Sequence, residues 1–197
     1  MILRPKVASP PLQAKLLSAV RDIARGAPFQ HPRTRGGGMT SAAMTNAGDA
    51  GWWSDRSGYR YLTRQPGSEQ PWPPLPEVFR EAVALAVEGS PWAGFEPDAC
   101  LINFYQAGAK MGLHQDRDER DFTQPIVTIS LGDDADFLIG GLERADKTTA
   151  VVVSSGDGVL MGPPGRMLFH GIRKIYPGTS RLAGLEGRIS LTFRKAL

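Results

Sequence analysis

Arg188-Ile189-Ser190-Leu191-Thr192-Phe193-Arg194 is the clearest strand in this chain of 197 residues and decides its fold. Apolar and polar side chains alternate along it, with the period of a β-strand that turns one face toward a core. The polar face carries two arginines, and an unpaired buried charge is very costly. A central strand would therefore need a compensating anion, most economically a dicarboxylate with one arginine at each end. The alternative is an edge strand with both arginines in solvent.

Other strand signals fill the chain after Pro97. The segments are short, rich in β-branched or aromatic residues, and separated by Gly, Asp and Pro turn residues. They cover residues 99–106, 126–131, 135–139, 150–154, 159–161, 166–172 and 188–194. Short strands that follow helices predict an α+β, mainly β fold, a two-sheet jelly roll with the helices backing one sheet.

Two helices are predicted before these strands. Apolar residues recur at helical spacing over residues 11–25, and again over residues 77–88. A proline-rich connector, residues 71–76, excludes a helix interior or a central strand there. Small residues at 39–46 form a plausible further strand.

Composition bounds the function only loosely. The net charge of +3 and the pI of about 9.2 are a mild hint of a polyanionic partner. The single cysteine, Cys100, rules out an intrachain disulfide and fits a reducing compartment. The start of the chain lacks the apolar run of a signal peptide, and no apolar run is long enough to span a membrane. We expect a soluble, cytoplasmic protein with no membrane contact.

A metal-binding pattern stands in Gly112-Leu113-His114-Gln115-Asp116-Arg117-Asp118. His114 and Asp116 point to one face of an extended segment, and His170 is the third candidate ligand. Two histidines and one carboxylate with open positions suit non-haem Fe(II), whereas zinc more often has closed nitrogen and sulfur ligands. A surface histidine beside a solvated aspartate is the alternative. His31, in a polar loop flanked by prolines, is expected to be solvated.

Aromatic and basic residues interleave between Gly51 and Tyr61 without a clean apolar face. Alternating aromatic side chains and arginines are typical of surfaces that stack on bases, so the segment reads as a lid over something flat. A hairpin whose aromatic side chains close the core is the alternative. The residues favour neither reading over the other.

Several motifs follow one another in a specific order. They are Ala43-Met44-Thr45-Asn46, Gly51-Trp52, Gly58-Tyr59-Arg60-Tyr61, Asn103-Phe104-Tyr105, the stretch 108–119, His170-Gly171-Ile172 and the stretch 188–194. Together, from about residue 34 to residue 195, they resemble the bacterial AlkB family of Fe(II)/2-oxoglutarate dioxygenases. The resemblance implies a double-stranded β-helix (jelly roll) with a nucleotide-recognition lid. It also implies oxidative demethylation of N-alkylated bases, of the 1-methyladenine and 3-methylcytosine type, in DNA or RNA. The reaction would convert 2-oxoglutarate to succinate and release formaldehyde.

The resemblance further implies a role for each residue of the core site. Fe(II) would be held by His114, Asp116 and His170, with 2-oxoglutarate and dioxygen as co-substrates. Arg194 with Asn103 would bind the carboxylate at the keto end of 2-oxoglutarate, and Arg188 with Tyr105 the distal carboxylate. Ser190 stands where the family usually has asparagine, so we expect weaker 2-oxoglutarate binding with activity retained. Met161 replaces an aromatic residue of the family.

The implied contacts with the damaged nucleotide are made by Trp52, Tyr59, Tyr61, Asp118 and Arg144. Asp118 can face the same cavity as Asp116, and a carboxylate there would prefer cationic methylated bases to neutral ones. The alternative is that Asp118 is a solvated aspartate paired with Arg117 or Arg120. A methyl group on the Watson–Crick edge requires single-stranded substrate or a flipped base, which Trp52 and the His114 ring could sandwich. The candidates for phosphate contacts are Lys110, Arg117, Arg144 and Arg166, and the alternative is that each is an ordinary surface charge.

We expect a single dioxygenase domain, residues 1–197, that works as a monomer. The lid would span about residues 34–65 and the jelly-roll core about residues 97–197. Two other functions remain open: a 2-oxoglutarate-dependent hydroxylase of a protein or small molecule, and a catalytically inactive nucleic-acid-binding module.

Overall fold

Strand β12 (Arg188–Arg194) lies inside a six-stranded antiparallel sheet in the computed structural model, which describes residues 1–34 and 36–197. The strand order of this sheet is β1-β10-β7-β12-β5-β2. The other strands are β1 (Ile2–Arg4), β2 (Ala43–Gly48), β5 (Ala99–Tyr105), β7 (Ile126–Gly132) and β10 (Gly158–Met161). Because β12 pairs with β5 on one side and β7 on the other, it is a central strand. The edge-strand alternative is thereby excluded.

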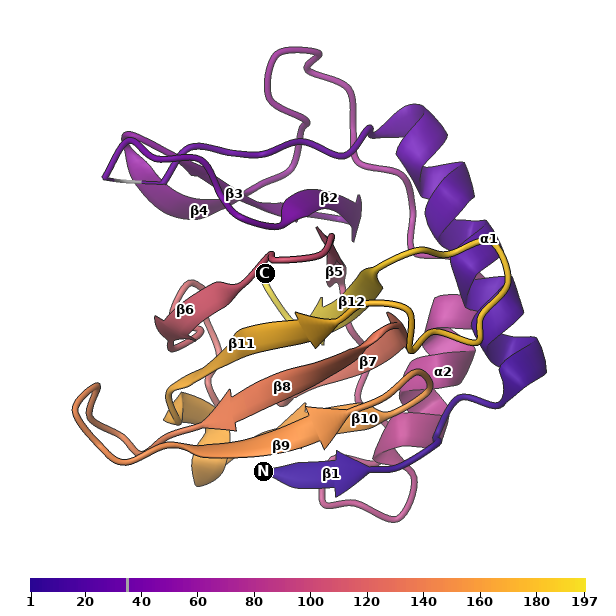
Figure 1. The fold of residues 1–197 in the computed structure, drawn as a ribbon. Helices are drawn as coiled ribbons and strands as arrows, with labels where there is room; N and C mark the ends of the chain where they lie inside the picture. Colours follow the sequence, from indigo (N-terminus) through magenta and orange to yellow (C-terminus); the bar gives the residue numbers. More distant parts are fainter. Residues whose placement is uncertain (35) are drawn as a thin grey trace.

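A four-stranded antiparallel sheet faces the first one (Figure 1). Its order is β6-β11-β8-β9, with bounds β6 (Met111–His114), β8 (Asp134–Ile139), β9 (Thr149–Val153) and β11 (His170–Tyr176). Buried side chains of both sheets meet between them, among them Ile126 and Met161 from one and Phe137 and Ile172 from the other. The predicted jelly roll is confirmed.

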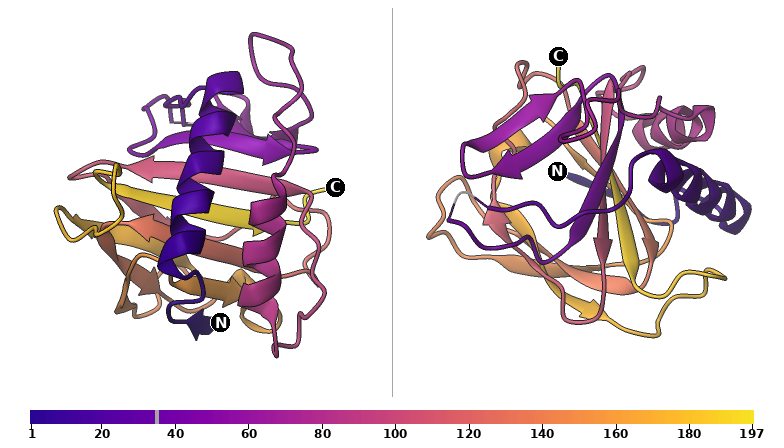
Figure 2. Two further views of the ribbon diagram at one scale, coloured as in Figure 1. Left: turned by 90° about the vertical axis from the view of Figure 1, so that its right-hand side faces the viewer. Right: turned by 90° about the horizontal axis from the view of Figure 1, so that it is seen from above.

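Helices α1 (Pro10–Gly26) and α2 (Glu77–Val87) lie side by side on the outer face of the six-stranded sheet (Figure 2, left). Ser9 caps α1 by accepting the backbone N–H of Leu12, and prolines occupy the first helical positions, where their missing N–H is no loss. The fully buried Phe79 of α2 packs edge-on against Phe193, with ring centroids 5.5 Å apart. Both predicted helices are confirmed, each with ends within one residue.

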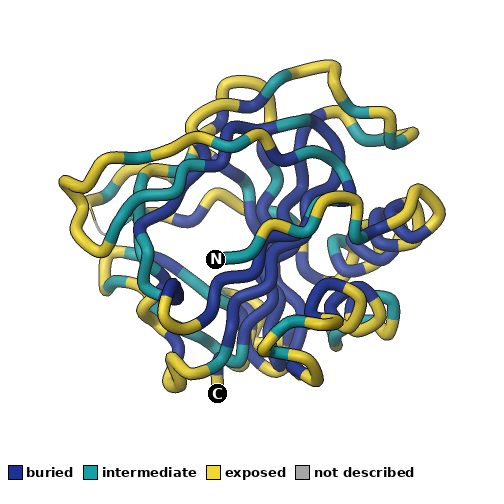
Figure 3. The backbone as a smooth tube through the Cα atoms, turned by 90° about the horizontal axis from the view of Figure 1, so that it is seen from below, coloured by how far each residue is buried: buried dark blue, intermediate teal, exposed yellow. Residues whose placement is uncertain are grey.

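The alternation along β12 divides its side chains between two environments. Ile189, Leu191 and Phe193 belong to the core between sheet and helices, while the polar side chains point between the sheets. All seven residues are buried. Figure 3 shows the buried parts of the chain, drawn dark blue, gathered in the strands through the middle of the molecule. Burying Leu191 and Phe193 contributes about 1.5–3 kcal/mol each to stability. That apolar face anchors the strand whose other face forms the site.

The aromatic segment forms a separate hairpin of β3 (Gly51–Asp55) and β4 (Gly58–Leu62) at one end of the jelly roll (Figure 2, right). An isolated hairpin is marginally stable, so side-chain contacts must hold it. The Asn46 amide donates to the Trp52 carbonyl and accepts the Trp52 N–H, at 3.1 and 3.0 Å. Ser54 donates to the Arg33 carbonyl at 2.7 Å. The hairpin is thus fastened to β2 and to the segment that precedes β2.

Some boundaries differ from the sequence prediction. The segment 166–172 divides into a 3-10 turn (Gly165–Met167) and the start of β11, because the Arg166 side chain turns inward to bond the Asp116 carbonyl. The small-residue strand begins at Ala43 instead of residue 39, and β1 and β6 were not predicted. Arg35, inside the predicted lid, lies outside the described residues. Within the described ranges, neither helix has the length and apolarity needed to cross a membrane.

Two glycines provide a test of the close packing between the end of β2 and the start of β5. Gly48 and Gly58 share a positive φ, 113° and 114°. A Cβ on Gly48 would lie 2.2 Å from the Asp98 carbonyl oxygen, whereas one on Gly58 would meet nothing within 4 Å. We expect Gly58→Ala to cost roughly 1–3 kcal/mol from backbone strain alone. Gly48→Ala should lower the free energy of unfolding, measured by chemical denaturation, by clearly more than Gly58→Ala does. Equal losses in the two variants would contradict this packing.

Candidate metal centre and co-substrate cavity

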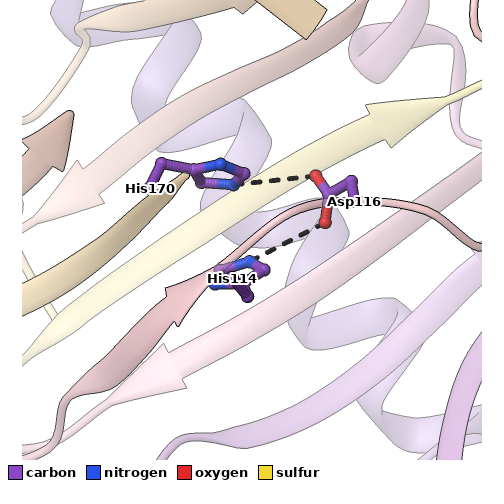
Figure 4. A group of neighbouring side chains, drawn as sticks. All are labelled: His114, Asp116 and His170. Carbon is purple, nitrogen blue, oxygen red and sulfur yellow. Dashed lines mark ion pairs between the residues drawn. The ribbon is translucent and has the colours of Figure 1, made fainter. Parts of the chain in front are cut away.

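His114, Asp116 and His170 converge at one point inside the jelly roll (Figure 4). The Asp116 Oδ1 lies 3.7 Å from His114 Nε2, and its Oδ2 lies 3.7 Å from His170 Nε2. One ligand atom from each residue falls within 4.8 Å of the others. Asp116 and His170 are buried and His114 is one-third exposed, so the cluster is enclosed on one side and accessible on the other.

Backbone carbonyls fix the orientation of both imidazoles. His114 Nδ1 lies 3.0 Å from the Gly112 carbonyl oxygen, and His170 Nδ1 lies 3.0 Å from that of Leu168. Because a carbonyl only accepts, each Nδ1 must carry the proton. Each Nε2 then presents its lone pair to the Asp116 side of the cluster, as metal-binding histidines do.

Strand pairing brings the two histidines together, although they are far apart in the sequence. β6 pairs with β11 so that His114 and His170 are direct partners, with ring centroids 4.4 Å apart. The next residue, Gly171, has no room for a side chain, since a Cβ there would lie 2.7 Å from the Met111 carbonyl oxygen. A glycine beside His170 therefore permits the close approach of the two strands.

The protonation states also favour metal binding. Burial opposes ionisation of Asp116, but Arg194 above all, followed by the two histidines, holds its pKa well below the usual range. Burial lowers the pKa of His170 to about 4, against a smaller opposing effect of Asp116. At neutral pH the cluster therefore offers one carboxylate and a neutral His170 imidazole. Two imidazoles, one carboxylate and open positions are the ligand set of non-haem Fe(II) sites, so the residues fit iron.

The cluster borders a cavity of about 880 Å³, within the usual size range of small-molecule sites. The polar face of β12 forms one wall, through Arg188, Ser190, Thr192 and Arg194. The neighbouring strand adds Asn103 and Tyr105, opposite Ser190 and Arg188 in the register. All five residues predicted to bind 2-oxoglutarate therefore line the same space as the three predicted metal ligands.

Arg188 is the least compensated charge in this wall. It is fully buried, and Nη2 donates to the Ser130 hydroxyl at 3.0 Å. The Tyr105 ring lies 5.2 Å from its guanidinium carbon. Among the residues that the structure describes, its Nε and Nη1 have no hydrogen-bond partner, and neither has Asn103 Oδ1. Burial lowers the pKa of Arg188, yet an arginine stays charged in proteins, so an anion is the expected partner.

Arg194 corrects the prediction that both arginines need an external anion. Its Nη2 lies 3.1 Å from Asp116 Oδ1, and its Nε lies 3.2 Å from Glu119 Oε1. The protein thus supplies two carboxylates to Arg194. Neither Nε nor Nη1 has a hydrogen-bond partner in the described part of the chain, and Nη1, which has no carboxylate contact either, remains for a ligand.

The hairpin presents its aromatic side chains to the cavity mouth. Trp52 and Tyr59 line the cavity and stack with ring centroids 5.4 Å apart. Asp118 also lines it and accepts the Trp52 indole N–H at 2.7 Å, in place of the pairing with Arg117 or Arg120 considered from sequence. The hairpin thus borders the cavity rather than closing the apolar core.

The remaining candidates fall into different places. Arg144 lines the cavity, stacks on Phe169 and donates to the Leu113 carbonyl. Tyr61 is not among the described cavity-lining residues, because its hydroxyl donates to Glu119. Met161 is buried between the sheets. His31 is exposed, with Nδ1 2.8 Å from the Thr40 carbonyl oxygen.

Two buried residues near the site were not predicted in these roles. Arg166, a candidate surface contact for phosphate, is buried and donates to Glu119 at 2.8 Å. Glu119 is buried as well. No sequence signal marks them, since Glu119 lies within a run of charged residues, 116–121, that is typical of a solvated loop. Lys110 and Arg117 are exposed, as phosphate contacts require.

Comparisons with known proteins agree with this site. The model of the 2OG-Fe(II) oxygenase superfamily matches residues 1–194. An "Alpha-ketoglutarate-dependent dioxygenase AlkB homolog" of Caulobacter vibrioides is 46% identical over 184 residues, which cover 93% of this chain and 82% of the relative. The "Alpha-ketoglutarate-dependent dioxygenase AlkB" of Escherichia coli is 41% identical over 182 residues, covering 92% and 84%. The solved structure of OsALKBH1 superimposes with a TM-score of 0.87 at 31% identity, covering 98% of this chain and 95% of that one.

Replacing Asp116 with alanine should destroy metal binding, because it removes the only carboxylate of the cluster. We expect Mn(II) affinity, measured by calorimetry or paramagnetic resonance, to fall by on the order of 100-fold or more. Asp118→Ala is the matched control, since its carboxylate borders the same cavity outside the cluster, and it should keep the wild-type affinity. Equal metal binding by Asp116→Ala and wild type would exclude this centre.

Proposed function

The chain belongs to the AlkB family of Fe(II)/2-oxoglutarate-dependent dioxygenases, and from this premise we propose that it oxidatively demethylates N-alkylated bases in DNA. Demethylation of alkylated nucleic-acid bases is the activity of that family. The proposal adds DNA as the substrate and 1-methyladenine and 3-methylcytosine as the lesions, with RNA as a second substrate.

One observation carries the proposal: the open side of the His114, Asp116 and His170 cluster faces the same cavity as the incompletely compensated Arg188. A metal with open positions needs further ligands, and a buried guanidinium needs an anion. A keto acid with a second carboxylate satisfies both at once. The aromatic side chains of the hairpin at the cavity mouth then suit a flat substrate.

The residues suggest how 2-oxoglutarate is held. Arg188 binds the distal carboxylate through Nε and Nη1, with the Tyr105 ring behind it. The free Nη1 of Arg194 and the Asn103 side chain contact the carboxylate at the keto end. Ser190 lies between Arg188 and Arg194 on β12. Its side chain is too short to replace an asparagine amide, so we propose weaker 2-oxoglutarate binding than in relatives with asparagine.

Iron and 2-oxoglutarate, when bound, supply the oxidation: the keto acid becomes succinate and carbon dioxide, and one oxygen atom of dioxygen hydroxylates the N-methyl group. The N-hydroxymethyl base then releases formaldehyde without a catalytic acid or base. The contribution of the protein is to position the methyl group and to exclude water from the cavity. The buried residues around Asp116 enclose that side of the cavity.

Base recognition is proposed to take place between the hairpin and the metal centre. A base enters flipped or from a single strand, because the methyl group lies on its pairing edge. We propose that Trp52 and the His114 ring sandwich it, since both line the cavity that Tyr59 and Arg144 also border. Asp118 contributes a negative charge, which favours 1-methyladenine and 3-methylcytosine because both are cations. Lys110 and Arg117 are exposed nearby for phosphates.

We also propose that residues 1–197 work as one catalytic domain, with the lid at 34–65 and the jelly-roll core at 97–197. A monomer suffices, because all the residues assigned here come from one chain. The single cysteine, Cys100, is free and buried, which suits a reducing compartment such as the cytoplasm.

The direct test is incubation of the protein with Fe(II), 2-oxoglutarate and a single-stranded oligonucleotide that contains 1-methyladenine. We expect unmethylated adenine, formaldehyde and succinate in equal amounts. The controls are the same oligonucleotide with Asp116→Ala and an unmethylated oligonucleotide with the wild type. Succinate without base repair would indicate a hydroxylase of another substrate. Binding without turnover would indicate an inactive nucleic-acid-binding module.

Asp118→Asn should reduce the preference for charged lesions. The amide still accepts the Trp52 N–H but carries no charge, so kcat/KM for 1-methyladenine should fall roughly tenfold relative to that for neutral 1-methylguanine. Asp121→Asn is the control, because that carboxylate is exposed on the same loop and, among the described residues, bonds Thr123 and Gln124 alone. An unchanged ratio in Asp118→Asn would contradict the electrostatic role.

A further inference from the structure

Three buried charged side chains and one half-buried tyrosine, from separate parts of the chain, meet beside the metal centre. This group, the Glu119 cluster, consists of Tyr61, Glu119, Arg166 and Arg194. The Glu119 side chain is only 2% exposed, that of Arg166 3% and that of Arg194 6%. Neither metal binding nor the proposed recognition of the base explains why these four side chains are held together.

Glu119 is the centre of these contacts. Its Oε1 accepts the Tyr61 hydroxyl at 2.5 Å and lies 3.2 Å from Arg194 Nε. The contact between Glu119 and Arg194 Nε is an ion pair and not a well-aligned hydrogen bond, because Nε has no hydrogen-bond partner among the described residues. Its Oε2 accepts Arg166 Nη2 at 2.8 Å, and Arg166 Nη1 donates to the Asp116 carbonyl at 2.9 Å.

These contacts define the position of the Arg194 guanidinium. Asp116 holds it at Nη2, and Glu119 holds it at Nε. The remaining group, Nη1, lies buried beside the cavity without a hydrogen-bond partner in the described residues. Two carboxylates thus aim the single free N–H₂ group of Arg194 at the space where the keto acid is proposed to bind.

The fourth member connects this arrangement to the hairpin. Tyr61 lies on β4, and its ring is intermediate in exposure while its hydroxyl reaches Glu119. Burial raises the pKa of Tyr61, so its hydroxyl keeps the proton and donates it. Without this donor, Oε1 of Glu119 would keep only the poorly aligned Arg194 contact, and a buried carboxylate oxygen without donors is costly.

We infer that Glu119 is a positioning residue for Arg194, and that its hydrogen bond from Tyr61 couples the docked position of the β3–β4 hairpin to the affinity for 2-oxoglutarate. The inference rests on the proposed function, in which Arg194 contacts the keto acid. Coupling of this kind is reciprocal, so 2-oxoglutarate must also stabilise the docked hairpin. In this account Tyr61 acts through Glu119 and not by touching the base.

The test uses Tyr61→Phe, which removes the hydroxyl and keeps the ring. The control is Tyr176→Phe, because Tyr176 also donates to a buried carboxylate, that of Asp136 at 3.0 Å, but on β11 outside the cavity lining. Two quantities are measured with Mn(II) in place of iron. The first is the dissociation constant of 2-oxoglutarate by calorimetry, and the second is hydrogen exchange of the hairpin amides with and without 2-oxoglutarate.

For the wild type and Tyr176→Phe we expect the same dissociation constant and slower exchange of the hairpin amides when 2-oxoglutarate is bound. For Tyr61→Phe we expect roughly five- to tenfold weaker 2-oxoglutarate binding and loss of that protection. Glu119→Gln should weaken binding further, by on the order of tens of fold, because both arginines lose a buried counter-charge.

A Tyr61→Phe variant with the wild-type dissociation constant and wild-type hairpin protection would overturn the inference. If Glu119→Gln fails to fold, Tyr61→Phe alone decides. Failure of the wild type to bind 2-oxoglutarate is a different result, which would overturn the proposed function itself. Weak binding by both tyrosine variants would indicate general destabilisation and also refute the specific link.

Discussion

The burial of two arginines on the inner face of β12 is the constraint on which the rest of the structure depends. Guanidinium groups keep their charge, so the space between the sheets cannot close as an ordinary apolar core. Arg194 is paired with carboxylates of the loop after β6, whereas Arg188 contacts only a hydroxyl and an aromatic ring among the described residues. The jelly roll therefore keeps a cavity with cationic groups in its wall beside the apolar side chains packed between the sheets, and much of the stability of β12 must come from elsewhere.

That stability comes from the other face of the same strand. Ile189, Leu191 and Phe193 pack with the two helices in a continuous apolar core, so the strand that carries the cationic wall is also one of the best anchored. A site built on such a strand holds its geometry without substrate. The hairpin, by contrast, is a two-stranded element attached by a few side-chain bonds, which suits the part of the site that has to admit a large substrate.

Local periodicity made much of this predictable from the sequence. The bounds of β12 and the ends of both helices follow from alternation and helical spacing, and His114 and Asp116 share a face because they are two residues apart. The Glu119 cluster was not predictable, since its members come from four separate segments and Glu119 and Arg166 individually resemble surface charges. β1 was missed for a similar reason: three residues carry little pattern, and their partner, β10, lies more than 150 residues away. The split at residues 166–172 reflects the inward turn of Arg166, a tertiary contact.

The backbone carbonyls that hold the two imidazoles also have a consequence for metal choice. Because the rings are oriented by Gly112 and Leu168 before any ion arrives, every divalent ion of the first transition series meets the same ready donors. Intrinsic affinity for such donors increases from manganese through iron and cobalt to nickel and copper. Selection of iron must then depend on what the cell supplies. An excess of cobalt or nickel would occupy the centre and silence the enzyme.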